Sequence, residues 1–290
     1  MSTGVPRIGA VVLTMNDRPD EFPKAMDSLL AQQGVDLDVV VVGNGCDPAQ
    51  VSPGVKTVAL PENVGIPEGR NIGARAVDGD LLFFFDNDAV LPDSDALARL
   101  AAALLQEPGL AYAQPRIADS DTGITLRRWV PRLRAGDPTR PGIVTVMAEG
   151  VVMIRRSAFD AAGGWPGHFF LFHEGIDLAW RLWDHGGTGR YLPDIVVHHP
   201  ATSPARHERF YRLNARNRVW LARRSLPAPL IPLNLAAFAL LTLWRFRDRA
   251  ALRATAAGFR EGLRGGHGRR APMSWRTVAR LTRAGRPPIV

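Results

Sequence analysis

Short apolar segments alternate with amphipathic segments along the first 110 residues, and this alternation restricts the possible folds more than any other feature. Each apolar segment is the length of one β-strand and carries few polar residues, as in VVVVG (39–43). Strands that are apolar on both faces are typical of a parallel sheet covered by helices on both sides. We therefore predict an α/β fold with a mostly parallel sheet, with strands in 7–16, 37–45, 55–65 and 80–85 and helices in 21–33, 68–77 and 94–108.

The later part of the sequence continues this pattern after an interruption. Residues 118–142 are polar and rich in Arg, Pro and Gly, which predicts a mobile surface loop near the functional site. A strand and a helix are expected within 144–164, a helix that ends at glycines in 174–187, and a last strand in 189–200.

Charge is distributed unevenly along the chain. Residues 1–200 carry 17 basic and 25 acidic residues, whereas residues 201–290 carry 19 arginines and three acidic residues. An acidic body suits metal binding, and a basic tail suits an anionic membrane surface or nucleic acid. We predict two domains, a nucleotide-binding and catalytic domain over 1–204 and a basic helical extension over 205–290.

The single cysteine, Cys46, excludes an internal disulfide framework and a cysteine-rich zinc site. The first residues, MSTGVPRIGAVVL, lack the basic stretch and long apolar region of a signal peptide. Both observations favour a cytoplasmic location, with peripheral attachment to the inner face of the membrane as a further expectation from the basic tail.

Two carboxylates stand at the end of the most apolar strand, in LLFFFDNDAV (81–90). Burying a charge is costly unless it is paired or bound to a metal. Two carboxylates on a turn at the end of a parallel strand can share one hard divalent cation, which also binds substrate phosphates. Solvated aspartates on a turn are the commoner explanation of an isolated Asp-x-Asp. Asp86 and Asp88 are thus candidate ligands of Mn²⁺ or Mg²⁺.

The segment VVVVGNGCDPA has the G-x-G-x-x-A spacing of dinucleotide-binding proteins. That motif needs a helix directly after the glycines, because the helix N-terminus receives the pyrophosphate. Pro48, Pro53 and Gly54 leave no room for such a helix before the next strand, so this interpretation fails.

Six segments follow one another in a fixed order: VLTMNDRPDEFPKAMDSLLAQQ, VVVVGNG, ENVGIPEGRNIGARAVDGDLLFFFDNDA, EGVVMIRRSAFDAAGGW, FLFHEGIDLAWRLWDHGG and YLPDIVVHHP. In this order they resemble the family 2 glycosyltransferases, which are inverting enzymes of the GT-A fold, over about residues 7–225. The resemblance implies transfer of a sugar from a nucleotide-diphosphate donor, with a divalent cation bridging the diphosphate. It also implies a Rossmann-like sheet with helices on both faces.

The resemblance further implies roles for individual residues. Asp86 and Asp88 match the family's Asp-x-Asp motif, and His199 matches a strand-end histidine that is a third metal ligand, with His198 as the substitute if the register differs by one. The implied donor-binding residues are Thr14, Asn16, Arg18, Asn44, Asn63, Gly65, Arg70, Asn71, Asp86 and Asn87. The family's acidic residue after the second strand is replaced by Gly43-Asn44. The identity of the nucleobase is therefore not predicted, and Asn44 or Asp17 is the expected contact with it.

The catalytic segment departs from the family pattern. The common form is Glu-Asp-x-Asp-Leu, with the first Asp as general base, whereas this chain has Glu174-Gly175-Ile176-Asp177-Leu178. Gly175 cannot act as a base, so we rank Glu174 first and Asp177 second as the group that removes the proton of the acceptor hydroxyl. Asp177 also stands four residues before Arg181, and an ion pair within the helix explains it at least as well.

The basic tail resembles, over 205–227, a segment that follows the catalytic domain in rhamnosyltransferase-like members. LIPLNLAAFALLTLW (230–244) is apolar nearly all round, but only 12 residues follow Pro232, and a membrane span needs about 20. The next segment gathers its large apolar residues on one helical face, with arginines elsewhere. Interfacial membrane attachment and a helical hairpin packed on the body or at a homodimer interface both remain open. Nucleic acid is not expected as a partner, because no nucleic-acid-binding module is visible.

The sequence therefore predicts a metal-dependent, inverting glycosyltransferase that uses a UDP- or dTDP-sugar, with dTDP-rhamnose as one candidate. The expected acceptor is a hydroxyl of a lipid-linked or cell-envelope glycan or of a small metabolite. A nucleotidyltransferase would also place aspartates at a strand end, but VVLTMNDRP supplies no glycine-rich phosphate loop. A non-catalytic partner protein of the same fold would be consistent with Gly175.

Overall fold

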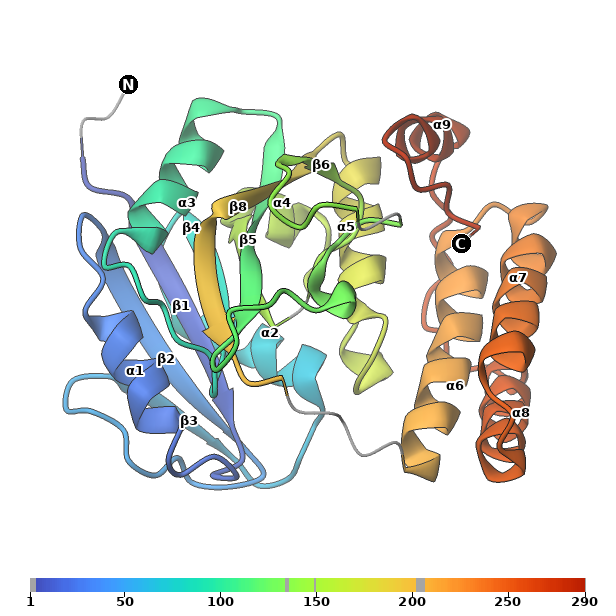
Figure 1. Cartoon of the computed structure of the whole chain (residues 1–290), viewed down its shortest axis with the longest axis horizontal. Helices are drawn as coiled ribbons and strands as arrows, with labels where there is room; N and C mark the ends of the chain where they lie inside the picture. The colour runs from blue at the N-terminus through green and yellow to red at the C-terminus, as the bar shows by residue number, and fades with distance from the viewer. Residues whose placement is uncertain (1–3, 134–135, 149, 202–206, 290) are drawn as a thin grey trace.

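The computed structural model describes residues 4–133, 136–148, 150–201 and 207–289. Within these residues, one eight-stranded sheet has the order β3-β2-β1-β4-β7-β5-β8-β6 (Figure 1). β7 is antiparallel to its neighbours β4 and β5, β6 is antiparallel to β8, and the other strands run parallel. The predicted mostly parallel α/β sheet is confirmed. The strands are β1 (Arg7–Thr14), β2 (Asp36–Asn44), β3 (Lys56–Leu60), β4 (Leu81–Asp86), β5 (Leu110–Asp119), β6 (Gly142–Val144), β7 (Val151–Arg155) and β8 (Thr188–His199).

Helices cover both faces of the sheet, and the three phenylalanines of β4 show how. Side chains alternate between the faces of a strand, so Phe83 and Phe85 join the core beneath α1 and α3, while Phe84 joins the opposite core beside Trp165. All three phenylalanines are at most 1% exposed. The helices of this part are α1 (Phe22–Leu30), α2 (Ile66–Ala76), α3 (Ala96–Gln106), α4 (Arg156–Ala161) and α5 (Glu174–Asp184).

β5 is a strand that the sequence pattern did not predict, because Gln114, Pro115 and Arg116 interrupt its apolar run. Gln114 is fully buried, and its side chain donates to the carbonyl of Val151 at 2.7 Å and accepts from the amide of Ala148 at 2.9 Å. A satisfied amide can lie in a core. The loop expected over 118–142 starts within β5, contains a short 3₁₀ helix, Arg127–Trp129, and ends at the first residue of β6.

Four more helices follow the sheet: α6 (Glu208–Ser225), α7 (Leu230–Arg245), α8 (Arg249–Arg264) and α9 (Trp275–Arg283). Trp220 and Leu221 of α6 and Leu281 of α9 belong to the same core as the residues of α5. The C-terminal helices therefore pack on the body of the molecule (Figure 1). The proposed domain boundary at residue 204 lies outside the described residues. No helix in the described part of the chain is long and apolar enough to cross a bilayer.

Candidate active site

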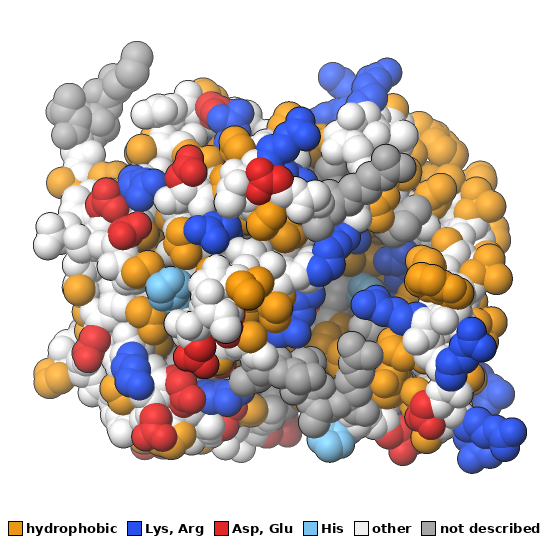
Figure 2. Space-filling view, viewed as in Figure 1, with side chains coloured by type: hydrophobic (Ala, Val, Ile, Leu, Met, Phe, Trp, Pro, Cys, Tyr) orange, Lys and Arg blue, Asp and Glu red, His pale blue; other side chains and the backbone are white. Residues whose placement is uncertain are grey.

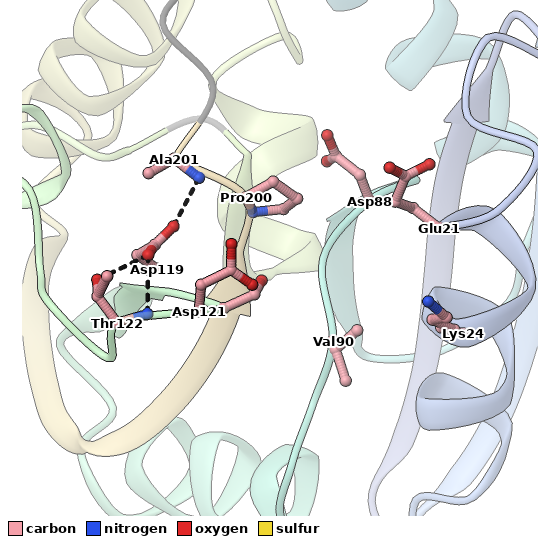
Figure 3. A pocket seen from close by; sticks show the side chains of 10 residues that line it. Glu21, Lys24, Asp88, Val90, Asp119, Asp121, Thr122, Pro200 and Ala201 are labelled. Atoms are coloured by element: carbon pink, nitrogen blue, oxygen red, sulfur yellow. Dashed lines mark hydrogen bonds between the residues drawn. The ribbon is translucent and has the colours of Figure 1, made fainter.

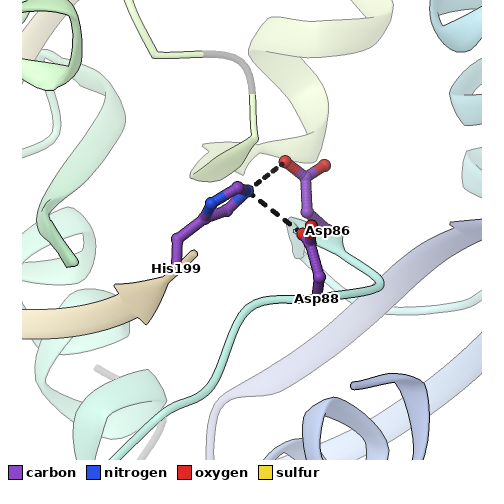
Figure 4. Close-up of side chains that lie close together, drawn as sticks. All are labelled: Asp86, Asp88 and His199. Atoms are coloured by element: carbon purple, nitrogen blue, oxygen red, sulfur yellow. Dashed lines mark ion pairs between the residues drawn. The ribbon is translucent and has the colours of Figure 1, made fainter. Parts of the chain in front are cut away.

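Two carboxylates and one imidazole converge where β4 and β8 end (Figure 4). The Nε2 atom of His199 lies 3.1 Å from Oδ1 of Asp88 and 3.5 Å from Oδ2 of Asp86. One potential ligand atom from each of the three residues lies within 4.8 Å of the others. Two oxygens and one imidazole nitrogen are a donor set that divalent cations accept, so the three residues fit a metal site.

A backbone bridge explains how residues of two separated strands meet. Two strands lie between β4 and β8 in the sheet, but the segment after β4 crosses to β8, where Val90 and His198 exchange hydrogen bonds of 2.8 and 2.9 Å. His198 is held by this bridge, and His199, one residue later, meets the aspartates. The register preferred from the sequence, with His199 rather than His198 beside the Asp-x-Asp motif, is the one observed.

Arginines compensate the negative charge of the cluster. Arg70 of α2 is 3% exposed and its Nη2 lies 2.8 Å from Oδ1 of Asp86, while Nε of Arg18 lies 3.5 Å from Asp88. Burial alone would raise the pKa of Asp86, but the hydrogen bond from His199 and the charge of Arg70 lower it below its ordinary value.

His199 is shifted in the opposite direction. Burial would lower its pKa, but hydrogen bonds and charges of Asp86 and Asp88 outweigh burial and raise the pKa to about 10. A protonated imidazole has no free lone pair, so a proton and a cation compete for this nitrogen. The ring also packs against Trp129, with 5.7 Å between the centroids. Trp129, in the segment expected to be a mobile loop, is only 8% exposed.

A cavity of about 530 Å³ adjoins the cluster. Most of the donor-binding residues expected from the sequence line it, together with the three metal-site residues. The predicted residues that line the wall are Thr14, Arg18, Asn44, Asn63, Gly65, Arg70, Asp86, Asn87, Asp88 and His199. Asp17, the second candidate for a nucleobase contact, also lines the cavity.

Other wall residues were missed by sequence reasoning. Phe170, Leu171 and Phe172 come from the loop before α5, and Arg209 and Phe210 from the start of α6. The α6 residues lie in the segment that we had assigned to a separate extension. Arg209 stacks over Phe170 at 4.8 Å from the ring centroid, so the extension and the loop meet at the cavity.

Two expected donor-binding residues lie outside the cavity wall and hold backbone instead. The amide of Asn16 bonds the carbonyl of Asp47 at 2.9 Å and the N–H of Ala49 at 3.0 Å. Asn71 bonds both backbone groups of Trp165, at 3.0 and 2.8 Å. These asparagines position the loops around the site.

The two candidate bases also lie outside the wall. Glu174 is the first residue of α5, directly after the loop that lines the cavity, and is 2% exposed. Asp177 is fully buried; it pairs with Arg181 at 2.6 Å, accepts from the hydroxyl of Ser225 at 3.0 Å, and lies 3.3 Å from Arg224. Because Ser225 and Arg224 belong to α6, Asp177 ties α5 to α6, and its geometry favours the structural explanation.

Asp88 also borders a second, open hollow of about 600 Å³ (Figure 3). Asp119 in its wall accepts from the amide and hydroxyl of Thr122 and from the amide of Ala201, at 2.6–2.9 Å. These bonds account for the lowered pKa of Asp119, led by the hydroxyl of Thr122. Asp121, at the rim, is exposed.

The loop before α5 has a strained backbone. Phe170, Phe172 and His173 have φ values of 68°, 76° and 68°, a region that residues with side chains rarely adopt. The fully buried side chain of Asn217 in α6 holds this loop, because its Nδ2 lies 2.6–3.0 Å from the carbonyl oxygens of Phe169, Leu171 and Phe172.

Gly65 supports the same loop from the other side. Its φ is 88°, and a Cβ at this position would lie 2.6 Å from backbone atoms of Phe170. The next residue, Ile66, donates its N–H to the carbonyl of Phe170 at 2.9 Å. The loop is therefore clamped between the start of α2 and the middle of α6, and only glycine permits the close approach.

Replacing Asn217 by Ala is expected to lower the free energy of unfolding by about 2–3 kcal/mol, because buried carbonyls lose their donor. Since the released loop lines the cavity, nucleotide affinity should fall as well. Urea denaturation and nucleotide calorimetry measure the two effects. Asn234→Ala is the matched control: Asn234 is also fully buried, but donates to the carbonyl of Pro288, after α9. Equal nucleotide affinity in both variants would contradict the clamp.

Comparison with known proteins places the chain in a family. Residues 10–163, more than half of the chain, match the family model described as glycosyl transferase family 2. A galactofuranosyltransferase, GlfT1, of Mycobacterium tuberculosis is 28% identical over 217 residues, which cover 67% of this chain and 70% of that protein. A probable N-acetylgalactosaminyltransferase 6 of Caenorhabditis elegans is 26% identical over 53% of this chain, but the match spans only 28% of its length.

A solved structure shows the same fold. The structure of GalNAc-T7 with UDP, GalNAc and Mn²⁺ superposes with a TM-score of 0.65 and 15% sequence identity, covering 90% of this chain and 55% of that one. At this identity the likeness concerns the fold alone, which is that of GT-A glycosyltransferases. Together with the family match, it shows that the chain belongs to glycosyl transferase family 2.

Proposed function

We propose that this protein transfers a sugar from a nucleotide-diphosphate donor to a hydroxyl group, with inversion at the anomeric carbon. The convergence of Asp86, Asp88 and His199 beside a cavity lined by three arginines carries the proposal. A bound divalent cation would supply positive charge to the leaving diphosphate. Arg70 holds Asp86 in place, and the asparagines of the wall offer donors and acceptors to the nucleoside.

We assign Mn²⁺ to the site in preference to Mg²⁺. Mg²⁺ is bound mainly by oxygen ligands and keeps several waters. His199 contributes a nitrogen within reach of both carboxylates, which suits Mn²⁺ better. The comparison protein GalNAc-T7 is described with Mn²⁺.

The proposed donor is a UDP- or dTDP-sugar. Asn44 and Asn63 lie in the cavity wall, where Nδ2 of Asn44 donates to Oδ1 of Asn63 at 3.0 Å. Asn44 is held by this bond and by the N–H of Val64, whereas Nδ2 of Asn63 contacts the sulfur of Met15, a weak acceptor, and can instead donate to a pyrimidine or ribose. dTDP-rhamnose is favoured by the resemblance of residues 205–227 to rhamnosyltransferase-like members, since residues of this segment line the cavity. We propose a lipid-linked or cell-envelope glycan as acceptor, with a small metabolite as the second candidate, and a cytoplasmic enzyme peripheral to the membrane.

A donor screen tests the function. Thermal unfolding would be followed with Mn²⁺ and a panel of UDP-, dTDP- and GDP-sugars, and nucleotide release measured for each stabilising donor. Release of nucleoside diphosphate supports sugar transfer, whereas release of pyrophosphate from a nucleoside triphosphate would support a nucleotidyltransferase. If donors bind with Mn²⁺ but none is turned over in the presence of candidate acceptors, a non-catalytic partner protein is the better interpretation.

We propose Glu174 as the general base, because it is the first acidic residue after the loop that lines the cavity. Glu174→Gln keeps the shape of the side chain and removes the carboxylate, so kcat should fall by about 10²-fold while donor affinity stays unchanged. A kcat within about threefold of the wild type would exclude this role for Glu174.

A further inference from the structure

Helix α7 exposes large apolar side chains on its outer side. Leu240, Leu243 and Trp244 are 68%, 59% and 76% exposed, whereas the polar residues Asn234 and Thr242 are 0% and 7% exposed. A surface helix normally places polar residues on its exposed side. The inner side of α7 is apolar as well, because Leu230 and Leu235 pack against the core of the body, so the outer apolar side chains are not needed for that packing.

Helix α8 also leaves its large apolar residues on its outer side. The residues that it buries are small: Ala251, Ala254, Gly258 and Gly262. A side chain at Gly258 would collide with the backbone of Arg212 in α6, so only small residues allow this close packing. The larger apolar residues of α8 are left on the other side, where they line a groove.

This groove lies between α7 and α8 and has a volume of about 420 Å³. Its wall is mainly apolar, with Thr242, Thr255 and Arg260 as the polar lining residues. The apolar wall consists mainly of Phe238, Leu243, Leu252, Ala256, Phe259 and Leu263. An apolar groove beside an exposed apolar helix is typical of a surface that contacts another phase or molecule.

Arginines predominate among the charged residues near this face. Arg245, Arg247, Arg249, Arg253 and Arg264 are exposed, and none forms an ion pair with a described residue. In Figure 2, hydrophobic side chains follow the right edge of the molecule over α7, and basic side chains gather at its lower end.

The two acidic residues of α8 and its cap are engaged elsewhere. Asp248 accepts from the amide of Ala251 at 2.9 Å, and Glu261 pairs with Arg212 and Arg216 of α6, at 2.8 and 3.4 Å. A second copy of the chain would therefore bring no free carboxylate on this face to the arginines. An anionic lipid surface offers both phosphates for the arginines and acyl chains for the groove.

We propose that the α7–α8 face docks on an anionic membrane. Leu240, Leu243 and Trp244 enter the boundary between headgroups and acyl chains, an acyl chain occupies the groove, and the arginines contact phosphates. α7 has 16 residues, fewer than the about 20 that a span requires, which agrees with a helix lying in the plane of the interface. The docking does not depend on the proposed chemistry.

Vesicle sedimentation of the full chain tests the proposal. Vesicles of phosphatidylglycerol and phosphatidylcholine in equal parts should bind the protein, and vesicles of phosphatidylcholine alone should bind it at least about tenfold more weakly. Binding should weaken as salt screens the charges. Replacing Arg245, Arg247 and Arg249 by Gln should weaken binding by about fivefold for each arginine.

The triple variant Leu240→Ser, Leu243→Ser, Trp244→Ser should lose binding by about tenfold or more and keep the wild-type melting temperature, because these side chains are exposed. Leu105→Ser with Ile143→Ser is the control, since these residues are 52% and 51% exposed on other surfaces. Failure of the wild type to sediment with anionic vesicles at low salt would overturn the proposal. So would a wild-type dimer that the triple variant converts to a monomer without any vesicle binding, because a second copy would then cover the face.

Discussion

Replacing Asp88 by Ala is expected to reduce Mn²⁺-dependent sugar transfer by at least about 10³-fold, which corresponds to about 4 kcal/mol of transition-state stabilisation. Asp88 supplies the carboxylate nearest to His199 and is 8% exposed. Without it, two of the three candidate ligands remain, and the cation is bound weakly or in the wrong position. Initial rates at a series of Mn²⁺ concentrations, with Mn²⁺ affinity from calorimetry, measure the effect.

Asp121→Ala is the matched control for this prediction. Asp121 lines the second hollow that borders Asp88, but does not belong to the cluster of Asp86, Asp88 and His199 (Figures 3 and 4). Its loss removes one negative charge from the same region and should change the rate by less than about threefold. If Asp88→Ala retained a tenth of the wild-type rate, or if both variants lost activity equally, the metal site would not be at Asp86, Asp88 and His199.

The strands of the parallel half could be predicted because their sequences leave one physical solution. LLFFF has no polar side, so both faces of β4 must be covered, and the aspartates must stand at or after the end of the strand. β5 could not be predicted in the same way, because the partners that satisfy Gln114 come from residues 148 and 151, far along the chain. The local hydrophobic pattern of a sequence predicts which residues are buried, but it does not predict which distant groups form hydrogen bonds with a buried polar side chain.

The residues of the candidate site also fall into a predictable group and a group that local sequence does not predict. Asp86 ends a strand, Asp88 follows it, and His199 ends another, so the geometry of parallel strands brings them to one edge. Asn16 and Asn71 have the same chemistry as ligand-binding asparagines, but bond backbone in this fold. The strained loop was also beyond prediction, because Phe and His disfavour positive φ and adopt it only when contacts such as those of Asn217 hold them.

The orientation of α7 is a further feature that the local sequence does not predict. Its sequence is apolar nearly all round, so helical periodicity does not indicate which side faces the body. One polar residue fixes the orientation: the fully buried Asn234 donates to the carbonyl of Pro288 at 3.0 Å. The partner of Asn234 comes from the C-terminus, after α9, and no pattern within α7 points to it.

Replacing Asp177 by Asn is expected to lower the free energy of unfolding by about 3–5 kcal/mol, the cost of breaking a buried ion pair by removing one partner. Arg181 and Arg224 would keep their charges in a site that is closed to water, because Asp177 itself is fully buried. Urea denaturation measures the loss. Below the unfolding transition, kcat per folded molecule should remain within about threefold of the wild type.

Asp184→Asn on the same helix is the control, because Asp184 is a hydrogen-bond acceptor for Ser274 and Thr277 and forms no ion pair with a described residue. It should cost about 1 kcal/mol, the usual net value of a hydrogen bond. The comparison decides between the two roles assigned to Asp177. A stable Asp177→Asn protein with a kcat lowered by about 10²-fold would make Asp177 the base and return Glu174 to a structural role. A destabilised protein with unchanged kcat would leave the base to Glu174, because Gly175 holds the position at which the family has its usual aspartate.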